Sequence, residues 1–162
     1  MTTLTGTRDP AALIDGLAAT PDRLDALLRE TDDAALDAAP PGEWPARTVL
    51  AHLRDDEFMV GRLRLERMAV EDAPALAPFD EKAWVASRWT GRDSLPELLA
   101  DFRAQRDASL HILRRLNPGD WRRTGAQPEY GTFDIHYWVE NWLDHDETHL
   151  AQIAAALEAA SA

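Results

Sequence analysis

The residues best suited to chemistry are two histidines, His145 and His149, in a stretch that reads as a long helix. Side chains four positions apart project from one helix face, one turn apart. Two imidazoles placed this way can hold one divalent metal ion, although such pairs also occur on helix surfaces without binding anything. The spacing therefore predicts two ligands of a metal site and requires a third from another element.

A third imidazole occurs in an earlier helical pattern, at residues 45–70. At 100° per residue, His52 and Asp56 share a face with Val49 and Val60, so we expect both polar side chains to point into the protein. The opposite, outward face is expected to carry Glu57, Phe58 and Gly61. His52 is therefore the candidate third ligand.

Two carboxylates accompany the candidate ligands. Asp146 follows His145 directly, and Asp56 lies one turn after His52. Burying five polar side chains without partners would be costly, whereas one metal ion bound by three neutral imidazoles, with carboxylates around it, satisfies them together. Asp56 and Asp146 are thus candidate catalytic residues that move protons or orient an imidazole. Pairing with an arginine and exposure at a cavity mouth are the alternatives.

Positioning these residues requires long helices, and the sequence contains four such patterns separated by segments with proline or glycine. They cover residues 11–30, 45–70, 94–117 and 132–157. Four amphipathic helices of this length predict an all-α four-helix bundle, and 162 residues suit a single domain. Thr20 and Pro21 are expected to interrupt the first helix, because threonine favours a helix cap and proline the first helical position.

The connection between the second and third helices, residues 71–93, is long for a bundle and is expected to be functional. It contains Trp84 and Trp89 and has room for a short helix. Together with Trp121 and Tyr130 in the next connection, these aromatic side chains either pin loops onto the bundle or wall a substrate cavity.

Composition narrows the partners and the location. The net charge of −12 argues against nucleic acid and anionic membranes, and no apolar run is long enough to span a bilayer. The N-terminus lacks the apolar core of a signal peptide, which favours the cytoplasm.

Cysteine is absent, so thiolate ligands, disulfides and a cysteine nucleophile are excluded. From Thr124 onward there are seven acids and no Lys or Arg, which favours a bound cation or reflects a solvated helix face.

Four sequence motifs resemble the DinB-like superfamily, which includes bacillithiol S-transferases and mycothiol-dependent maleylpyruvate isomerases. They are Gly42-Glu43-Trp44, His52-Leu53 with Asp55 and Glu57, Pro128-Glu129-Tyr130-Gly131, and His145-Asp146-x-x-His149-Leu150-x-Gln152-Ile153. The match covers most of the chain, and the last motif is the most specific. One departure is Pro45, where many relatives carry a serine that can cap the following helix.

The resemblance implies an up-down-down-up four-helix bundle, often dimeric, in which one histidine of the second helix and two of the fourth bind a divalent ion. In this chain they are His52, His145 and His149, the three residues that helical periodicity selects on its own. Zinc or nickel is the expected metal, with iron or manganese as alternatives, and a low-molecular-weight thiol is a candidate cofactor. The expected partners are a small-molecule substrate and a second copy of the chain, as a homodimer.

These observations leave more than one function open. The leading hypothesis is a metal-dependent enzyme, a thiol S-transferase or a hydrolase, in which three protein ligands leave coordination positions for water or substrate. The alternatives are a non-catalytic metal- or small-molecule-binding stress-response protein and a purely structural helical protein. Peptidase activity is discounted, because Asp146 follows the first histidine in place of the glutamate of H-E-x-x-H.

Overall fold

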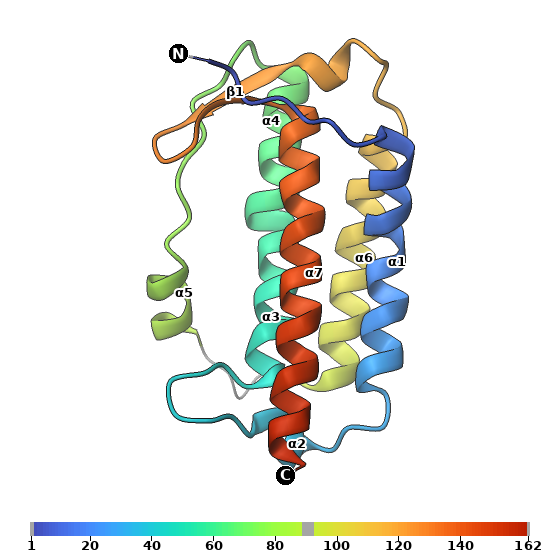
Figure 1. Cartoon of the computed structure of the whole chain (residues 1–162), viewed down its shortest axis with the longest axis vertical. Helices are drawn as coiled ribbons and strands as arrows, with labels where there is room; N and C mark the ends of the chain where they lie inside the picture. Colours follow the sequence, from blue (N-terminus) through green and yellow to red (C-terminus); the bar gives the residue numbers. More distant parts are fainter. Residues whose placement is uncertain (1, 89–92, 162) are drawn as a thin grey trace.

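The computed structural model describes residues 2–88 and 93–161. Four long helical columns stand side by side in it, as Figure 1 shows. They are α1 (Pro10–Leu28), the continuous column of α3 (Ala46–Asp56), η1 (Glu57–Arg62) and α4 (Leu63–Val70), then α6 (Leu95–Leu113) and α7 (Ile135–Ala160). The predicted all-α four-helix bundle is confirmed.

The four columns follow an up-down-down-up order. In Figure 1, α1 and α7 run downward, whereas the α3–α4 column and α6 run upward. Helices α1 and α3 each pack against both α6 and α7. Because two successive columns are parallel, the connection at residues 71–93 has to return along the bundle, which explains its length. It carries α5 (Glu81–Ser87) on the outside, and a short helix, α2 (Asp33–Asp37), lies between α1 and α3.

A small antiparallel hairpin, which the sequence analysis does not predict, lies at the upper end of the bundle in Figure 1. It consists of β1 (Thr124–Gln127) and β2 (Gly131–Asp134), preceded by a 3-10 turn, η3 (Asp120–Arg122). Helix α7 therefore begins at Ile135 instead of the predicted residue 132. Asp134 caps this helix, because its carboxylate accepts from the Tyr137 backbone N–H at 2.8 Å.

A buried polar layer at mid-height divides the apolar core into two clusters. The cluster toward the hairpin includes Leu17 and Leu110, and the cluster toward α2 includes Leu24 and Phe102. Between the clusters, each column contributes at least one polar side chain that is at most 1% exposed: Thr20 of α1, Glu57 of η1, Arg106 and Ser109 of α6, and Asp146 of α7. Such a layer fixes the heights of the columns relative to one another only if its polar groups are paired.

Arg106 pairs the groups of this layer. Its Nη1 donates to Asp146 Oδ2 at 2.7 Å, and its Nη2 donates to Glu57 Oε2 at 2.8 Å and to Asp146 Oδ1 at 3.1 Å. Charge-assisted hydrogen bonds to two carboxylates offset most of the free energy that a buried arginine loses when it is removed from water. One side chain of α6 therefore links α6 to η1 and α7.

The same arginine explains why α1 is not interrupted. Pro21 has no backbone N–H, so the Leu17 carbonyl one turn earlier lacks its helical donor. Arg106 Nη1 donates to that carbonyl at 2.7 Å. The predicted break at Thr20 and Pro21 is therefore wrong. The Thr20 hydroxyl caps no helix and donates to Asp146 Oδ2 at 2.7 Å.

The α3–α4 column contains a π-helical turn, η1, in which the hydrogen bonds skip one residue more than in an α-helix. The turn changes the phase of the column, so the expected outward direction of Glu57 and Gly61 is wrong. Glu57 is 1% exposed, and a Cβ at Gly61 would lie 2.3 Å from the Trp142 ring. Only glycine therefore lets α7 approach this closely. Phe58 is 39% exposed, as expected.

Candidate metal centre

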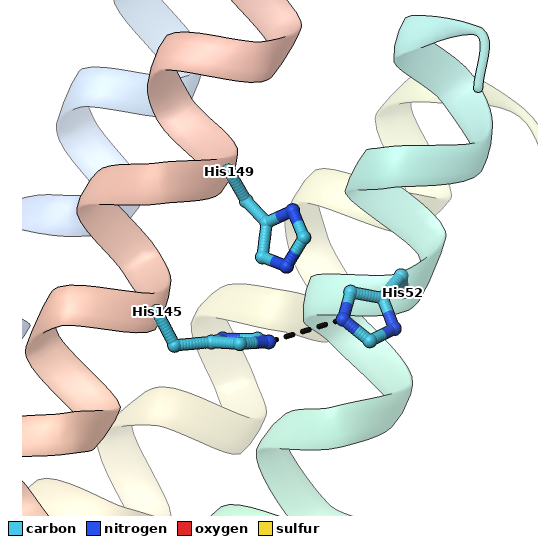
Figure 2. A group of neighbouring side chains, drawn as sticks. All are labelled: His52, His145 and His149. Atoms are coloured by element: carbon cyan, nitrogen blue, oxygen red, sulfur yellow. Dashed lines mark hydrogen bonds between the residues drawn. The ribbon is translucent and has the colours of Figure 1, made fainter. Parts of the chain in front are cut away.

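Three imidazoles converge between α3 and α7. Figure 2 shows His145 and His149 reaching from α7 toward His52 on the facing helix. The candidate ligand atoms of the three residues all lie within 4.8 Å of one another, and the Nε2 atoms of His52 and His145 are 3.0 Å apart. His52 and His149 are buried, and His145 is half-buried. The structure thus brings together the three residues that the sequence analysis selects.

The donor set fits one divalent ion. Nitrogen atoms at about 2.05 Å from a tetrahedral zinc ion lie roughly 3.3 Å apart, close to the separation seen here between His52 and His145. Burial, followed by the neighbouring imidazoles, lowers the pKa of His52 to about 3 and that of His145 to about 4. Both rings are therefore neutral near pH 7, the form in which imidazole binds metal.

Two of the rings are oriented by their surroundings. The His149 Nδ1 donates to Gln152 Oε1 at 2.8 Å, which leaves His149 Nε2 as the atom available for a ligand. His52 packs edge-on against the indoles of Trp44 and Trp84, with ring centroids 5.4 Å from each. These contacts hold the rings in place before any metal ion binds.

Two carboxylates face the same nitrogen atoms. Asp56 Oδ2 lies 3.4 Å from His145 Nε2 and 3.8 Å from His52 Nε2, and Glu81 Oε1 of α5 lies 3.5 Å from His52 Nε2. Burial raises the pKa of Asp56 to about 7, with repulsion from Glu81 as the second cause. A carboxyl group with this pKa can exchange a proton near neutral pH.

The second candidate acid, Asp146, lies in the polar layer of the core. Both its oxygen atoms accept hydrogen bonds from Arg106, and Oδ2 also accepts from Thr20. Among the described residues, no hydrogen bond joins its carboxylate to an imidazole. Asp146 thus fixes the rotation and height of α7, and with them the direction of His145 and His149.

A cavity of about 240 Å³ adjoins the histidine cluster. Near the cluster it is lined by His52, Asp56, Glu81 and His145, and its other lining residues include side chains of the α3–α4 column, of α7 and of the hairpin. Aromatic side chains form much of the wall: Phe79, Tyr130, Phe133, Tyr137, Trp138 and Trp142. Two of the candidate ligands, His52 and His145, therefore face a space that a small molecule can enter.

The sequence analysis assigns no role to three residues of the site, although it quotes one of them, Gln152, within the most specific motif. Glu81 comes from the long connection, whose path no local pattern gives. Gln152 lies three residues after His149, and this helical spacing is the signal that could have identified it. Arg64 lines the cavity from α4, beyond the π-helical turn that upsets the arithmetic of helix faces.

The aromatic residues of the connections have different roles. Trp84 pins α5 onto α3, because its indole N–H donates to Asp55 Oδ2 at 3.0 Å. Tyr130 lines the cavity, and Trp121 lies in the apolar core. Trp89 lies outside the described residues. Both predicted roles, pinning a loop and walling a cavity, therefore occur.

Comparison with known proteins supports the family. The family model of the DinB superfamily matches residues 17–153. The chain belongs to the DinB superfamily. A relative from Oceanobacillus iheyensis, OB0782, named as an inferred metal-dependent hydrolase, is 32% identical over 114 residues, which cover 70% of this chain and 65% of the relative.

A solved DinB-like structure has the same fold. YfiT from Bacillus subtilis, described as an inferred metal-dependent hydrolase with an unusual four-helix bundle topology, aligns with a TM-score of 0.84. The sequences are 23% identical, and the alignment covers 94% of this DinB chain and 91% of YfiT. At this identity the likeness supports the fold and says nothing about the reaction.

Pro45 occupies the cap position of α3 and provides no side-chain cap, as expected from the missing serine. Within residues 2–88 and 93–161, no helix is both long and apolar enough to cross a membrane.

Proposed function

We propose that this DinB protein is a metal-dependent hydrolase of a small molecule, with His52, His145 and His149 as the metal ligands. The observation that carries the proposal is the convergence of three imidazoles beside a cavity. Three protein ligands leave coordination positions for water and substrate, whereas a structural zinc site is closed by a fourth protein ligand. The name of the Oceanobacillus relative supports the same class of reaction.

The surrounding residues supply the remaining functions. When bound, a divalent ion would acidify a water molecule and polarise a substrate carbonyl. Asp56 lies on the cavity side of the histidines, where its carboxylate would accept a proton from water and return it to the leaving group. Glu81 adds a negative charge that favours a bound cation. Asp146 is assigned to positioning, since Arg106 and Thr20 occupy its oxygen atoms.

Thiol transfer is the neighbouring reaction that the same site would perform on a low-molecular-weight thiol. The chain has no cysteine of its own, so the thiol would be external. Hydrolysis is preferred, because Asp56 places a proton acceptor for water beside the candidate ligands. Both reactions use the same metal, so one set of variants tests both.

The test is metal content and activity of protein purified without a histidine tag. We expect about one zinc or nickel ion per chain and metal-dependent hydrolysis of 4-nitrophenyl acetate, with His149→Ala losing both by at least about tenfold. His111→Ala, which removes an exposed histidine of α6, is the matched control and should leave both unchanged. No metal in the wild type, and no change in melting temperature on adding zinc or nickel, would contradict the site. Metal binding without hydrolysis or thiol transfer would favour the non-catalytic alternative.

A further inference from the structure

The cavity contains a buried cation that the hydrolytic chemistry does not use. Arg64 is 7% exposed and is the sole Lys or Arg among the described residues that line the cavity. Its guanidinium lies over the Trp138 ring at 4.8 Å from the centroid, and its Nη2 donates to the Ala77 carbonyl at 2.9 Å. The side chain is therefore held in a defined position beside the aromatic wall.

Arg64 has donors that no protein group uses. A guanidinium carries five N–H donors, and within the described part of the chain the Arg64 side chain makes the single hydrogen bond to Ala77 and no ion pair. Two other buried arginines, Arg47 and Arg106, each bind two carboxylates. Burial lowers the pKa of Arg64 below its ordinary value despite nearby acids, which is the sign of an incompletely compensated charge.

We propose that Arg64 binds a carboxylate of the substrate, at the end of the cavity remote from the three histidines. Trp138 and His145 are seven residues apart on α7, which places the guanidinium roughly 10 Å from the histidine cluster along the helix axis. The arginine fork matches a carboxylate, whose two oxygens can accept a pair of parallel hydrogen bonds.

The other residues that line the cavity restrict the chemical class of the ligand further. Phe79, Tyr137 and Trp138 line it, so the body of the ligand is apolar or aromatic. Its other charged lining residues are Asp56, Glu81 and Glu129, which disfavour a ligand with several negative charges. The substrate class is a small monocarboxylate with an ester or amide group several bonds from the carboxylate. The assignment of an ester or amide as the reacting group rests on the proposed hydrolase function, whereas the binding of the carboxylate by Arg64 does not.

The test compares two ligands with one skeleton, 3-phenylpropanoate and its neutral amide, 3-phenylpropanamide. Binding is followed by calorimetry and by tryptophan fluorescence, with both chelator-treated and zinc-loaded full-length protein. In the wild type we expect the carboxylate to bind about tenfold more tightly than the amide, the usual gain from a charge-assisted hydrogen bond. Arg64→Gln should remove this preference and leave the zinc affinity unchanged.

Two further variants guard against indirect effects. Arg67→Gln removes the same charge from the same helix outside this cavity, and it should keep the preference. Arg64→Lys should retain part of it, since a lysine keeps the charge without the planar fork. If Arg64→Gln does not fold, as judged by circular dichroism, the partial loss in Arg64→Lys decides the matter.

Each contrary result has a distinct meaning. Equal affinities in the wild type, or a preference that survives both Arg64 substitutions, would overturn the proposal. A preference that disappears on chelation would place the carboxylate on the metal and would overturn it too. A preference that persists in chelated protein without any hydrolytic activity would support the Arg64 site and count against the hydrolase alone.

Discussion

At the scale of single residues, Gln152 is the side chain whose effect on the metal site is best defined. Its Oε1 accepts from His149 Nδ1 and so selects the tautomer whose Nε2 faces the other two imidazoles. We expect Gln152→Leu to weaken zinc binding by about 10- to 100-fold, the usual cost of losing a hydrogen-bond partner of a ligand histidine. Competition against a chromophoric chelator measures this affinity.

Two controls separate orientation from packing. Gln152→Glu keeps an acceptor at the same place and should stay within a few-fold of the wild type. Gln105→Leu changes a glutamine on α6 that has no contact with the cluster, and it should have no effect. Wild-type affinity in Gln152→Leu would mean that packing alone orients His149.

The sequence predicts the ligands better than their surroundings. His145 and His149 follow from one helical spacing, and His52 follows from the apolar stripe of its own helix, because both patterns are local. Glu81 reaches the cluster from α5, which hydrogen bonds of Trp84 and Arg88 to Asp55 join to α3, and no spacing encodes these contacts. Arg64 lies beyond η1, where counting at 100° per residue no longer applies.

At the scale of elements, Arg106 is the residue that joins the columns. Arg106→Met would leave Glu57 and Asp146 buried without their cation, and we expect a loss of about 3–5 kcal/mol in the free energy of unfolding. Urea unfolding in the presence of a chelator measures the loss. Arg103→Met on the same helix breaks only partly exposed pairs with α1 and should cost less than about 1 kcal/mol. Similar losses in the two variants would show that the buried layer contributes no special stability.

The elements themselves are only partly predictable. The four long helices follow from apolar periodicity, and the up-down-down-up order follows from the family resemblance. The hairpin is missed, because each strand has four residues whose sequence does not alternate clearly between apolar and polar types. Pro21 gives a wrong break, since the donor that replaces its missing N–H comes from Arg106, 85 residues later in the chain.

At the scale of the whole molecule, the buried site makes stability depend on pH in two opposite ways. His52 has a pKa of about 3 in the folded protein and about 6.5 when unfolded. Between these values only the unfolded chain binds the proton, so this contribution to stability is complete above about pH 6.5 and is lost as the pH falls. Asp56 has a pKa of about 7 in the folded protein and an ordinary value of 3.8, so between these values only the folded protein binds its proton. Acidification from about pH 7 therefore adds stability through Asp56.

Comparing variants separates these two contributions from the titration of groups far from the site, which is common to both proteins. We expect the stability advantage of chelator-treated wild type over His52→Asn to shrink by about 1.4 kcal/mol for each unit that the pH falls between about 6.5 and 4.5. Over the same range, the difference between wild type and Asp56→Asn should change by a similar amount in the opposite direction, because Asp56 gains its proton in the folded state. Urea unfolding at several pH values gives both slopes. Two flat lines would show that His52 and Asp56 keep their ordinary pKa values in the metal-free protein, and a slope of the opposite sign for either residue would contradict the direction of its pKa shift.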